Sequence, residues 1–263
     1  MKIFLSEYRH DYLTYTFGYT IYAVYENPND LNELYSNGFL PYTGNTQLIY
    51  NVYYKSRGIR VDLNKFKDSS ENRRVNRKVI PLELKVEITP IAGFNQQESF
   101  FEFARKYREE RIGEDKMPDG RIEYILCRPY LTHILTFKQG DQTVAYVLGV
   151  ITDKCFHFWF SFYETQYLDQ NIPLGKWLMW KCIHIAREMG LEYLYLGNGY
   201  LEKSLYKSRD FNAVEYYNGN NWSGDLKTLQ TLCVGDNQLI DLDQFKLTAS
   251  PNDWLQNWLD SPG

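Results

Sequence analysis

The chain has 263 residues, of which 44% are apolar and 17% aromatic, so it can bury a substantial core and general disorder is excluded. It has no uncharged apolar run of about 18 residues, and its start, MKIFLSEYRHDY, lacks the apolar stretch and cleavage site of a secretory signal. We therefore expect a cytoplasmic protein that does not enter a membrane. The cysteines are widely spaced without a CxxC pair, so we expect reduced thiols and no metal site: Cys127, Cys155, Cys182 and Cys233.

The first part of the chain predicts alternating strands and helices from its apolar periodicity and turn residues. The expected elements, in order, are strands over 1–26, a helix over 27–38, strands over 47–56 and 58–63, a helix over 69–79, a strand over 81–90, and helices over 95–113 and 117–130. The helix over 27–38 is predicted from its ends, with Asn27 as N-cap, Pro28 at the first position and Gly38 as the stop.

A basic run distinguishes the helix over 69–79 and the strand before it. Residues 55–78 carry nine Lys or Arg and three Asp or Glu, so this segment has a net charge of +6 and the rest of the chain −10. A Ser cap and an early Glu open the helix, which places the basic side chains on a helical surface. Such a surface is either solvated or binds a polyanion.

From residue 131 onward the pattern is that of a strand-rich core. We expect three strands within 131–164 with tight turns at 140–141 and 152–153, then a loop, a helix over 174–189, a strand over 191–197, a helix around 200–211 and a capped C-terminal helix over 250–261. The helix over 174–189 has an apolar face and ends at Gly190. The residues of this face are Leu174, Leu178, Cys182, Ile185 and Met189.

The order strand–strand–loop–helix–strand–helix resembles an acetyltransferase-like (GNAT) core, the fold of acyl-CoA N-acyltransferases. We therefore expect an α+β chain with a mixed, splayed β-sheet flanked by helices and an N-terminal α/β extension. The extension with the basic helix is expected over residues 1–95 and the transferase core over 96–263, forming one compact unit. The strands near 155–164 and 191–197 are expected to splay beside a helix N-terminus, which favours anions. The loop DQNIPLGKW has one glycine and a proline, so it fits poorly with a glycine-rich CoA phosphate loop.

Three motifs resemble the aminoacyl-tRNA–protein transferases, which include arginyl-tRNA–protein transferase and bacterial leucyl-transferring relatives. The first is GIRVDLNKFKDSSENRRVNRK, similar to the family's V-P-L-R-V…F-x-x-S-x-S-Q-R-R-V-x-R. The second is FYETQYLDQNIPLGKWLMWKCIHIAREMGLEYLYLG, similar to F-Y-D-P…S-L-G-x-Y…Y-x-Y-L-G, and the third is YLEKSLYKSRDF, similar to C-P-K-M-x-Y-K. The resemblance spans about residues 30–217. The chain departs from it in lacking the N-terminal paired cysteines and in having Glu164 and Thr165 where the family has Asp and Pro.

The resemblance implies an aminoacyltransferase that moves an aminoacyl group from aminoacyl-tRNA to an amine, most simply the N-terminus of a protein or peptide, without a cofactor. The tRNA and the protein or peptide acceptor are therefore the expected partners. An ester reacts downhill with an amine, so the enzyme chiefly positions its substrates and stabilises an oxyanion. The implied tRNA contacts are arginines on phosphates with two neutral hydrogen-bond donors beside them: Arg73, Arg74, Arg77, Ser69 and Asn72.

The remaining motif positions imply the reaction centre. Glu164 is expected to grip a cationic aminoacyl group, hold the acceptor ammonium or accept its proton, with Tyr163 beside it. The N–H groups of Leu174 and Gly175 are expected to face the oxyanion. The implied substrate-binding residues of the later motifs are Gly197, Tyr206 and Lys207. The histidines match no motif and are assigned structural roles: His10, His133, His157 and His184.

Two other functions remain open from the sequence. One is a GNAT-type N-acyltransferase that uses acyl-CoA or an acyl-carrier protein on a peptide or small-molecule amine. The other is an inactive module of the same fold that binds RNA or a degron. The weak phosphate loop disfavours CoA as the donor, and the joint presence of Glu164, Gly175, Tyr206 and Lys207 favours an active enzyme.

Overall fold

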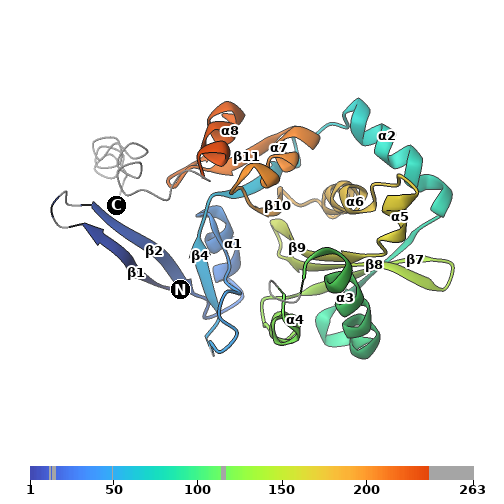
Figure 1. Cartoon of the computed structure of the whole chain (residues 1–263), viewed down its shortest axis with the longest axis horizontal. Helices are drawn as coiled ribbons and strands as arrows, with labels where there is room; N and C mark the ends of the chain where they lie inside the picture. The colour runs from blue at the N-terminus through green and yellow to red at the C-terminus, as the bar shows by residue number, and fades with distance from the viewer. Residues whose placement is uncertain (12, 14–15, 49, 114–116, 237–263) are drawn as a thin grey trace.

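The computed structural model describes residues 1–236 with the exception of 12, 14–15, 49 and 114–116, and its strands form two sheets (Figure 1). The strands are β1 (Lys2–Asp11), β2 (Thr16–Val24), β3 (Phe39–Pro41), β4 (Val52–Lys55), β5 (Gly58–Asp62), β6 (Lys85–Pro90), β7 (His133–Gln139), β8 (Gln142–Ile151), β9 (Cys155–Tyr163), β10 (Tyr193–Asn198), β11 (Val214–Tyr217) and β12 (Trp222–Ser223). The α-helices are α1 (Asp30–Ser36), α2 (Ser70–Val79), α3 (Gln97–Arg111), α4 (Asp119–Leu126), α5 (Gln166–Asp169), α6 (Leu174–Glu188), α7 (Tyr206–Asp210) and α8 (Leu226–Gly235).

The larger sheet has eight strands in the order β12-β11-β5-β10-β9-β8-β7-β6. Strands β6 to β9 pair antiparallel with one another, whereas β9 and β10 run parallel. The pairing of β9 with β10 covers only Cys155 to His157, although β9 continues to Tyr163. The mixed sheet therefore splays between these two strands, and the predicted α+β, GNAT-like fold is confirmed.

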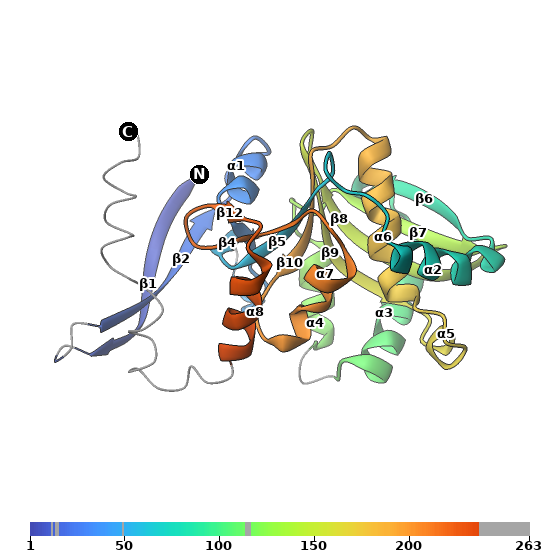
Figure 2. The ribbon, with the colours of Figure 1, turned by 90° about the horizontal axis from the view of Figure 1, so that it is seen from above.

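Helices cover both faces of the larger sheet (Figure 1). Alternate residues of β8 enter two separate cores, with Ala145 and Val147 on the side of α6 and Tyr146 and Leu148 on the side of α3. Helix α2 lies beside α6 on the first face, as Figure 2 also shows. No helix among the described residues is long and apolar enough to cross a membrane.

The smaller sheet comes from the N-terminal part of the chain and has the strand order β1-β2-β4-β3. Its β1–β2 hairpin extends away from the rest of the molecule (Figures 1 and 2). A core rich in tyrosine joins this sheet and α1 to the larger sheet, since the ring of Tyr35 lies 4.9 Å from that of Tyr195 on β10. In the same core the ring of Tyr53 lies 5.1 Å from that of Tyr130, in the turn before β7.

The N-terminal part also supplies strands to the larger sheet. β5 lies between β10 and β11, and β6 forms one edge beside β7. The predicted boundary between the extension and the core, at residues 95 and 96, stays a prediction. The larger sheet contains strands from both sides of this boundary, because β5 and β6 precede it and pair with strands that follow it.

Two helix ends differ from the prediction. α1 begins at Asp30 rather than at Asn27, because the Asp30 carboxylate accepts hydrogen bonds from the backbone N–H groups of Glu26 and Asn27 at 3.1 and 3.3 Å and holds that segment as a turn. Met189 was expected on the buried face of the central helix, but α6 ends one residue earlier and Met189 is 43% exposed.

Other differences concern the C-terminal part of the chain. The helix expected around 200–211 is a 3-10 turn, Glu202–Ser204, followed by the short α7. β11, β12 and α8 were not predicted: the two strands are short, whereas α8 has a helical spacing of apolar residues and an Asp225 cap that the sequence reading did not use. The helix predicted over 250–261 lies outside the described residues.

Candidate functional site

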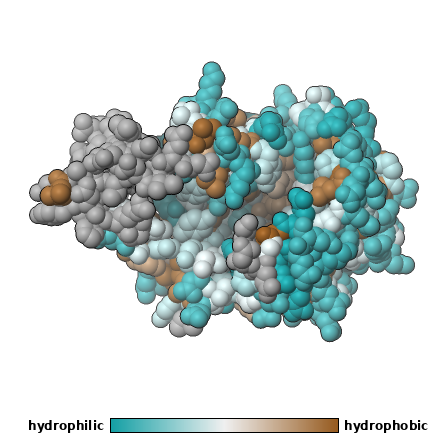
Figure 3. Space-filling view, in the orientation of Figure 1, coloured by the Kyte–Doolittle hydropathy of each residue, from teal (hydrophilic) through white to brown (hydrophobic). Residues whose placement is uncertain are grey.

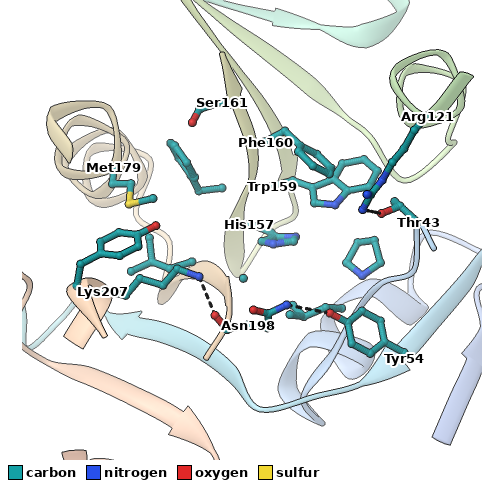
Figure 4. A pocket seen from close by; sticks show the side chains of 16 residues that line it. Thr43, Tyr54, Arg121, His157, Trp159, Phe160, Ser161, Met179, Asn198 and Lys207 are labelled. Carbon is teal, nitrogen blue, oxygen red and sulfur yellow. Dashed lines mark hydrogen bonds between the residues drawn. The ribbon is translucent and has the colours of Figure 1, made fainter. Parts of the chain in front are cut away.

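A cavity of about 340 Å³ lies where β9 and β10 separate (Figure 4). Its walls come from β9, β10, α6 and α7 of the predicted core, from α4, and from the smaller sheet on the opposite side. Beyond His157, β9 pairs with no described strand on the β10 side, so its backbone edge faces this space. β9 also bulges here, because Leu148 pairs with Phe160 and Gly149 with Phe158, which leaves Trp159 as the extra residue.

The apolar part of the lining comes mainly from β9 and α6. Phe158, Trp159 and Phe160 follow one another along the free strand edge, and Met179 contributes a lining side chain from α6. Figure 4 shows Met179 on one side of β9 and the rings of Trp159 and Phe160 on the other. Pro41 from β3 lines the side formed by the smaller sheet. These surfaces suit an uncharged group of moderate size.

The charged part of the lining is cationic. Among the described residues that line the cavity, Arg121 and Lys207 carry charge and no carboxylate is present. Arg121 extends from α4 and donates from Nη2 to the Thr43 hydroxyl at 2.8 Å. The cavity therefore favours an anionic or carbonyl group over a cation.

Lys207 lies at the meeting point of α7 and β10. Its Nζ donates to the Asn198 carbonyl oxygen at 2.7 Å, and burial lowers the pKa of Lys207 to about 8. Gly197 has φ +81°, a left-handed conformation that favours glycine, and a Cβ there would make only an ordinary contact with Nζ at 3.7 Å. Burial raises the pKa of Tyr206 to about 12, so its hydroxyl keeps its proton. The structure thus brings three predicted substrate-binding residues, Gly197, Tyr206 and Lys207, into one cavity.

His157 also lines the cavity, although the sequence assigned it a structural role. It is 1% exposed, and its Nδ1 lies 3.0 Å from the hydroxyl of Tyr35 on α1. Nε2 is buried and has no hydrogen-bond partner among the described residues. Burial, with a smaller effect of the Lys207 charge, lowers the pKa of His157 to about 3, so the ring is neutral at physiological pH. The sequence signal that could have indicated a site role for His157 was its position as a lone polar ring within the aromatic strand CFHFWFSFY.

Glu164 follows β9 but does not line the cavity. Its Oε2 accepts a hydrogen bond from Lys106 Nζ at 2.7 Å, and its side chain is only 11% exposed. The expected cation partner of this carboxylate is therefore already present within the chain, on α3.

Tyr163 and Gly175 contact each other outside the cavity lining. A Cβ on Gly175 would lie 2.8–2.9 Å from the ring carbons and hydroxyl of Tyr163, so the close approach of this ring requires a glycine at the start of α6. Leu174 is fully buried, and its N–H donates to the Ile172 carbonyl at 2.9 Å. The expectation that the Leu174 N–H faces an oxyanion is therefore wrong, because a neighbouring turn uses that donor.

The basic helix α2 has one face attached to α6 and one face open. Asn72 is 1% exposed, and its amide bonds the Asp210 carbonyl at 2.9 Å and the Ser69 N–H at 3.0 Å. Ser69 in turn accepts from the Asn72 N–H at 3.0 Å, which completes a capping box. The expected phosphate contact of Asn72 is corrected, because both ends of its amide are used within the fold. Ser69 has a helix-capping role.

The arginines of α2 are exposed. Arg74 pairs with Glu71 at 2.6 Å, which reduces its availability for a phosphate, and the Arg73 guanidinium donates to the Asp68 carbonyl at 2.8 Å. Arg77 is exposed one turn beyond Arg73. Figure 3 shows that hydrophilic residues cover most of the face of the molecule on which α2 lies.

The chemistry available to the cavity is that of hydrogen bonding and cationic charge. Within the described residues no three His, Cys, Asp or Glu side chains gather as a metal ion requires. The cavity instead offers a neutral imidazole, an ammonium, a guanidinium and an unpaired strand edge. Such donors can orient a carbonyl compound and stabilise negative charge that forms on its oxygen.

Comparison with known proteins gives relatives of one kind. The chain is 26% identical over 160 residues to an aspartate/glutamate leucyltransferase of Chromohalobacter salexigens, covering 57% of this chain and 62% of that protein. It is 28% identical over 173 residues to the enzyme of the same name from Ruegeria pomeroyi, covering 62% of this chain and 60% of that protein. The chain thus spans less than two thirds of the length of these relatives. A solved structure of L-PGS from Bacillus licheniformis aligns with a TM-score of 0.39 and 12% identity over 65% of this chain and 52% of that one, which is too weak to support an argument.

The names of these relatives agree with the family that the three sequence motifs resemble. A family profile also matches a continuous part of the structure described above. Residues 70–208, just over half of the chain, match the acetyltransferase (GNAT) domain, and this range contains the splayed strands and the core side of the cavity. The chain therefore belongs to the acetyltransferase (GNAT) domain family.

Proposed function

We propose that this protein transfers an uncharged aminoacyl group from aminoacyl-tRNA to the α-amine of a protein or peptide whose first residue is acidic. One observation carries the proposal: the cavity at the strand splay has apolar walls and, among its described lining residues, only cationic charge. The names of the relatives, aspartate/glutamate leucyltransferases, describe a donor and acceptors of this chemical kind.

The donor side of the proposal rests on the apolar walls. Trp159, Phe160 and Met179 offer a surface for an aliphatic aminoacyl side chain such as leucyl. An arginyl or lysyl group would instead enter a space whose described lining residues include Arg121 and Lys207 but no carboxylate, which is electrostatically unfavourable. This replaces the expectation that Glu164 selects a cationic donor.

The acceptor side rests on the two cations. An N-terminal Asp or Glu places a carboxylate a few bonds from the reacting amine, so the amine and the carboxylate can enter one cavity that Arg121 and Lys207 line from opposite sides (Figure 4). The α-amine has a pKa of about 7.7–8.0, so part of it is neutral near pH 7 and attacks the ester without a strong base. Positioning of the two substrates is then the main task of the protein.

The tRNA is proposed to lie against the open face of α2. Arg73 and Arg77 are one helical turn apart and exposed, so they form a short row suited to successive phosphates. The strongly acidic remainder of the chain confines this attraction to the basic segment.

An acyl-CoA donor is the second candidate, because the matching family is described as an acetyltransferase domain. A CoA pyrophosphate would need the open first turn of α6. That turn is occupied by the Tyr163 ring over Gly175 and by the internal hydrogen bond of Leu174, which weighs against this donor.

The test uses the purified full chain with three donors and two matched acceptors. Leucyl-tRNA, arginyl-tRNA and acetyl-CoA are each offered to two peptides that differ only in an N-terminal Asp or Asn, and the products are identified by mass spectrometry. We expect leucyl transfer to the Asp peptide at the highest rate. Acetyl transfer without aminoacyl transfer would establish the second candidate, and tRNA binding without any transfer would establish a binding module.

A further inference from the structure

The imidazole of His157 has two nitrogens in different surroundings. Nδ1 is held by the hydroxyl of Tyr35 at 3.0 Å, behind the cavity wall. Nε2 belongs to a ring that lines the cavity, is buried, and has no partner among the described residues. A buried polar atom without a partner is unfavourable unless a ligand supplies one, so Nε2 marks a position where a bound molecule makes a hydrogen bond.

The hydrogen bond behind the cavity wall relates the proton of Tyr35 to the tautomer of His157. Tyr35 is fully buried, and burial keeps the pKa of its hydroxyl well above 10, so the hydroxyl always has a proton to donate. The neighbouring Tyr53 hydroxyl interacts electrostatically with that of Tyr35 but makes no hydrogen bond of good geometry among the described residues, whereas Nδ1 of His157 lies 3.0 Å from the Tyr35 hydroxyl. If Tyr35 donates to Nδ1, the neutral ring carries its single proton on Nε2, directed to the cavity.

Lys207 reinforces this arrangement from the other side of the space. Burial is the main cause that keeps the His157 ring neutral, and the positive charge of Lys207 acts in the same direction with a smaller effect. Figure 4 shows the Lys207 ammonium and the His157 ring extending into the same cavity from α7 and β9.

We propose that His157 is a catalytic residue whose Nε2–H binds the ester carbonyl oxygen of the aminoacyl donor and the oxyanion formed from it, and that Tyr35 is the positioning residue that holds the ring in this tautomer. This inference rests on the proposed aminoacyl transfer. The amine nitrogen bonds to the carbonyl carbon, and the carbonyl π electrons move to the oxygen that Nε2–H contacts. When the carbonyl re-forms, the bond to the ribose oxygen breaks, and that oxygen gains the proton that the amine nitrogen loses. The products are an amide and a free ribose hydroxyl, and no oxidant, reductant or further reactant is needed.

The test combines kinetics with a direct measurement of the tautomer in the full chain. His157→Phe removes the donor, whereas His157→Gln keeps an N–H at about the reach of Nε2. We expect His157→Phe to lower kcat about 10²–10³-fold with little change in the KM of either substrate, and His157→Gln to restore most of the rate. His133→Phe, a histidine outside the cavity lining, is the matched control and is expected to leave kcat unchanged.

The second measurement is the ¹⁵N spectrum of the histidine rings between pH 6 and 8, with His157→Gln used to assign the signal. We expect a protonated Nε2 and an unprotonated Nδ1 in the wild type, and a shift toward the other tautomer in Tyr35→Phe. A proton on Nδ1 in the wild type, or full leucyl transfer by His157→Phe, overturns the inference and leaves the proposed function intact. If His157→Phe does not fold, the test rests on the wild-type ¹⁵N spectrum and on the kcat of His157→Gln. In that case a kcat of His157→Gln more than about 10²-fold below that of the wild type also overturns the inference. Absence of any aminoacyl transfer by the wild type overturns the proposed function, and the inference with it.

Discussion

The cation Lys207 predicts how acceptor preference changes with pH. The pKa of Lys207 is lowered to about 8 by burial, so its ammonium fraction falls from about nine tenths at pH 7 to about one tenth at pH 9. The groups that surround it are the Asn198 carbonyl, His157, Cys233 and the Tyr206 ring at 5.9 Å, and among these only Cys233 raises the pKa. An acceptor carboxylate binds the ammonium and gains little from the neutral amine.

The assay is the ratio of kcat/KM for two peptides that differ only in N-terminal Asp or Asn. The pH dependence of kcat/KM reports the pKa values of the free enzyme and the free substrate. Because the α-amines of the two peptides titrate similarly, their contribution cancels in the ratio, which then follows the ionisation of Lys207. We expect the part of the Asp preference that depends on Lys207 to fall about tenfold between pH 7 and 9. In Lys207→Arg the charge persists across this range, so the ratio should stay constant. A constant ratio in the wild type would refute the assignment of Lys207 as the acceptor cation.

Three further outcomes follow from the geometry of α2, Glu164 and Gly175. Replacing Arg73 and Arg77 by Ala should weaken tRNA binding and reduce the log–log salt slope by about 0.9 for each duplex phosphate that an arginine no longer neutralises, whereas an unchanged slope in filter-binding titrations would mean that α2 is a solvated surface. Glu164→Gln should leave kcat and the preference for leucyl-tRNA nearly unchanged, because this carboxylate pairs with an internal cation outside the cavity. A fall in kcat of about 10²-fold would instead show that Glu164 takes part in the reaction. Gly175→Ala should cost about 1–3 kcal/mol of unfolding free energy in urea titrations, and much less in a Tyr163→Ala background, since the added Cβ meets the Tyr163 ring; equal costs in both backgrounds would contradict that contact.

The sequence by itself determined the features that depend on neighbouring residues. The alternation along residues 131–164 and the helical periodicity after it predicted the order of the core, and the structure has β7, β8, β9, α6 and β10 in that order. The start of α2 was also predictable, because a capping box joins residues only three apart in the chain. Gly197 and Lys207 were found through motifs, and both line the cavity.

Tertiary structure alone decided which side chains share the cavity. His157 meets Tyr35, 122 residues away in the chain, and only this contact turns a lone histidine in an aromatic strand into an oriented donor. Arg121 reaches the cavity because α4 packs beside the smaller sheet, where Thr43 accepts its hydrogen bond. No local pattern contains such contacts, since periodicity and capping act over a few residues whereas a cavity is formed by segments far apart in the chain.

The same reason explains the residues whose expected roles changed. Asn72 lies in a basic motif, but its amide is used by the Asp210 carbonyl on a distant helix. Glu164 stands where the family has an acid, but a lysine 58 residues earlier neutralises it. The sequence determined which residue types were present and the order of the elements that carry them. The packing of the smaller sheet and α4 against the splayed strands decided which of those residues meet, because a charge or hydrogen bond takes its partner from whatever the fold places within a few ångströms.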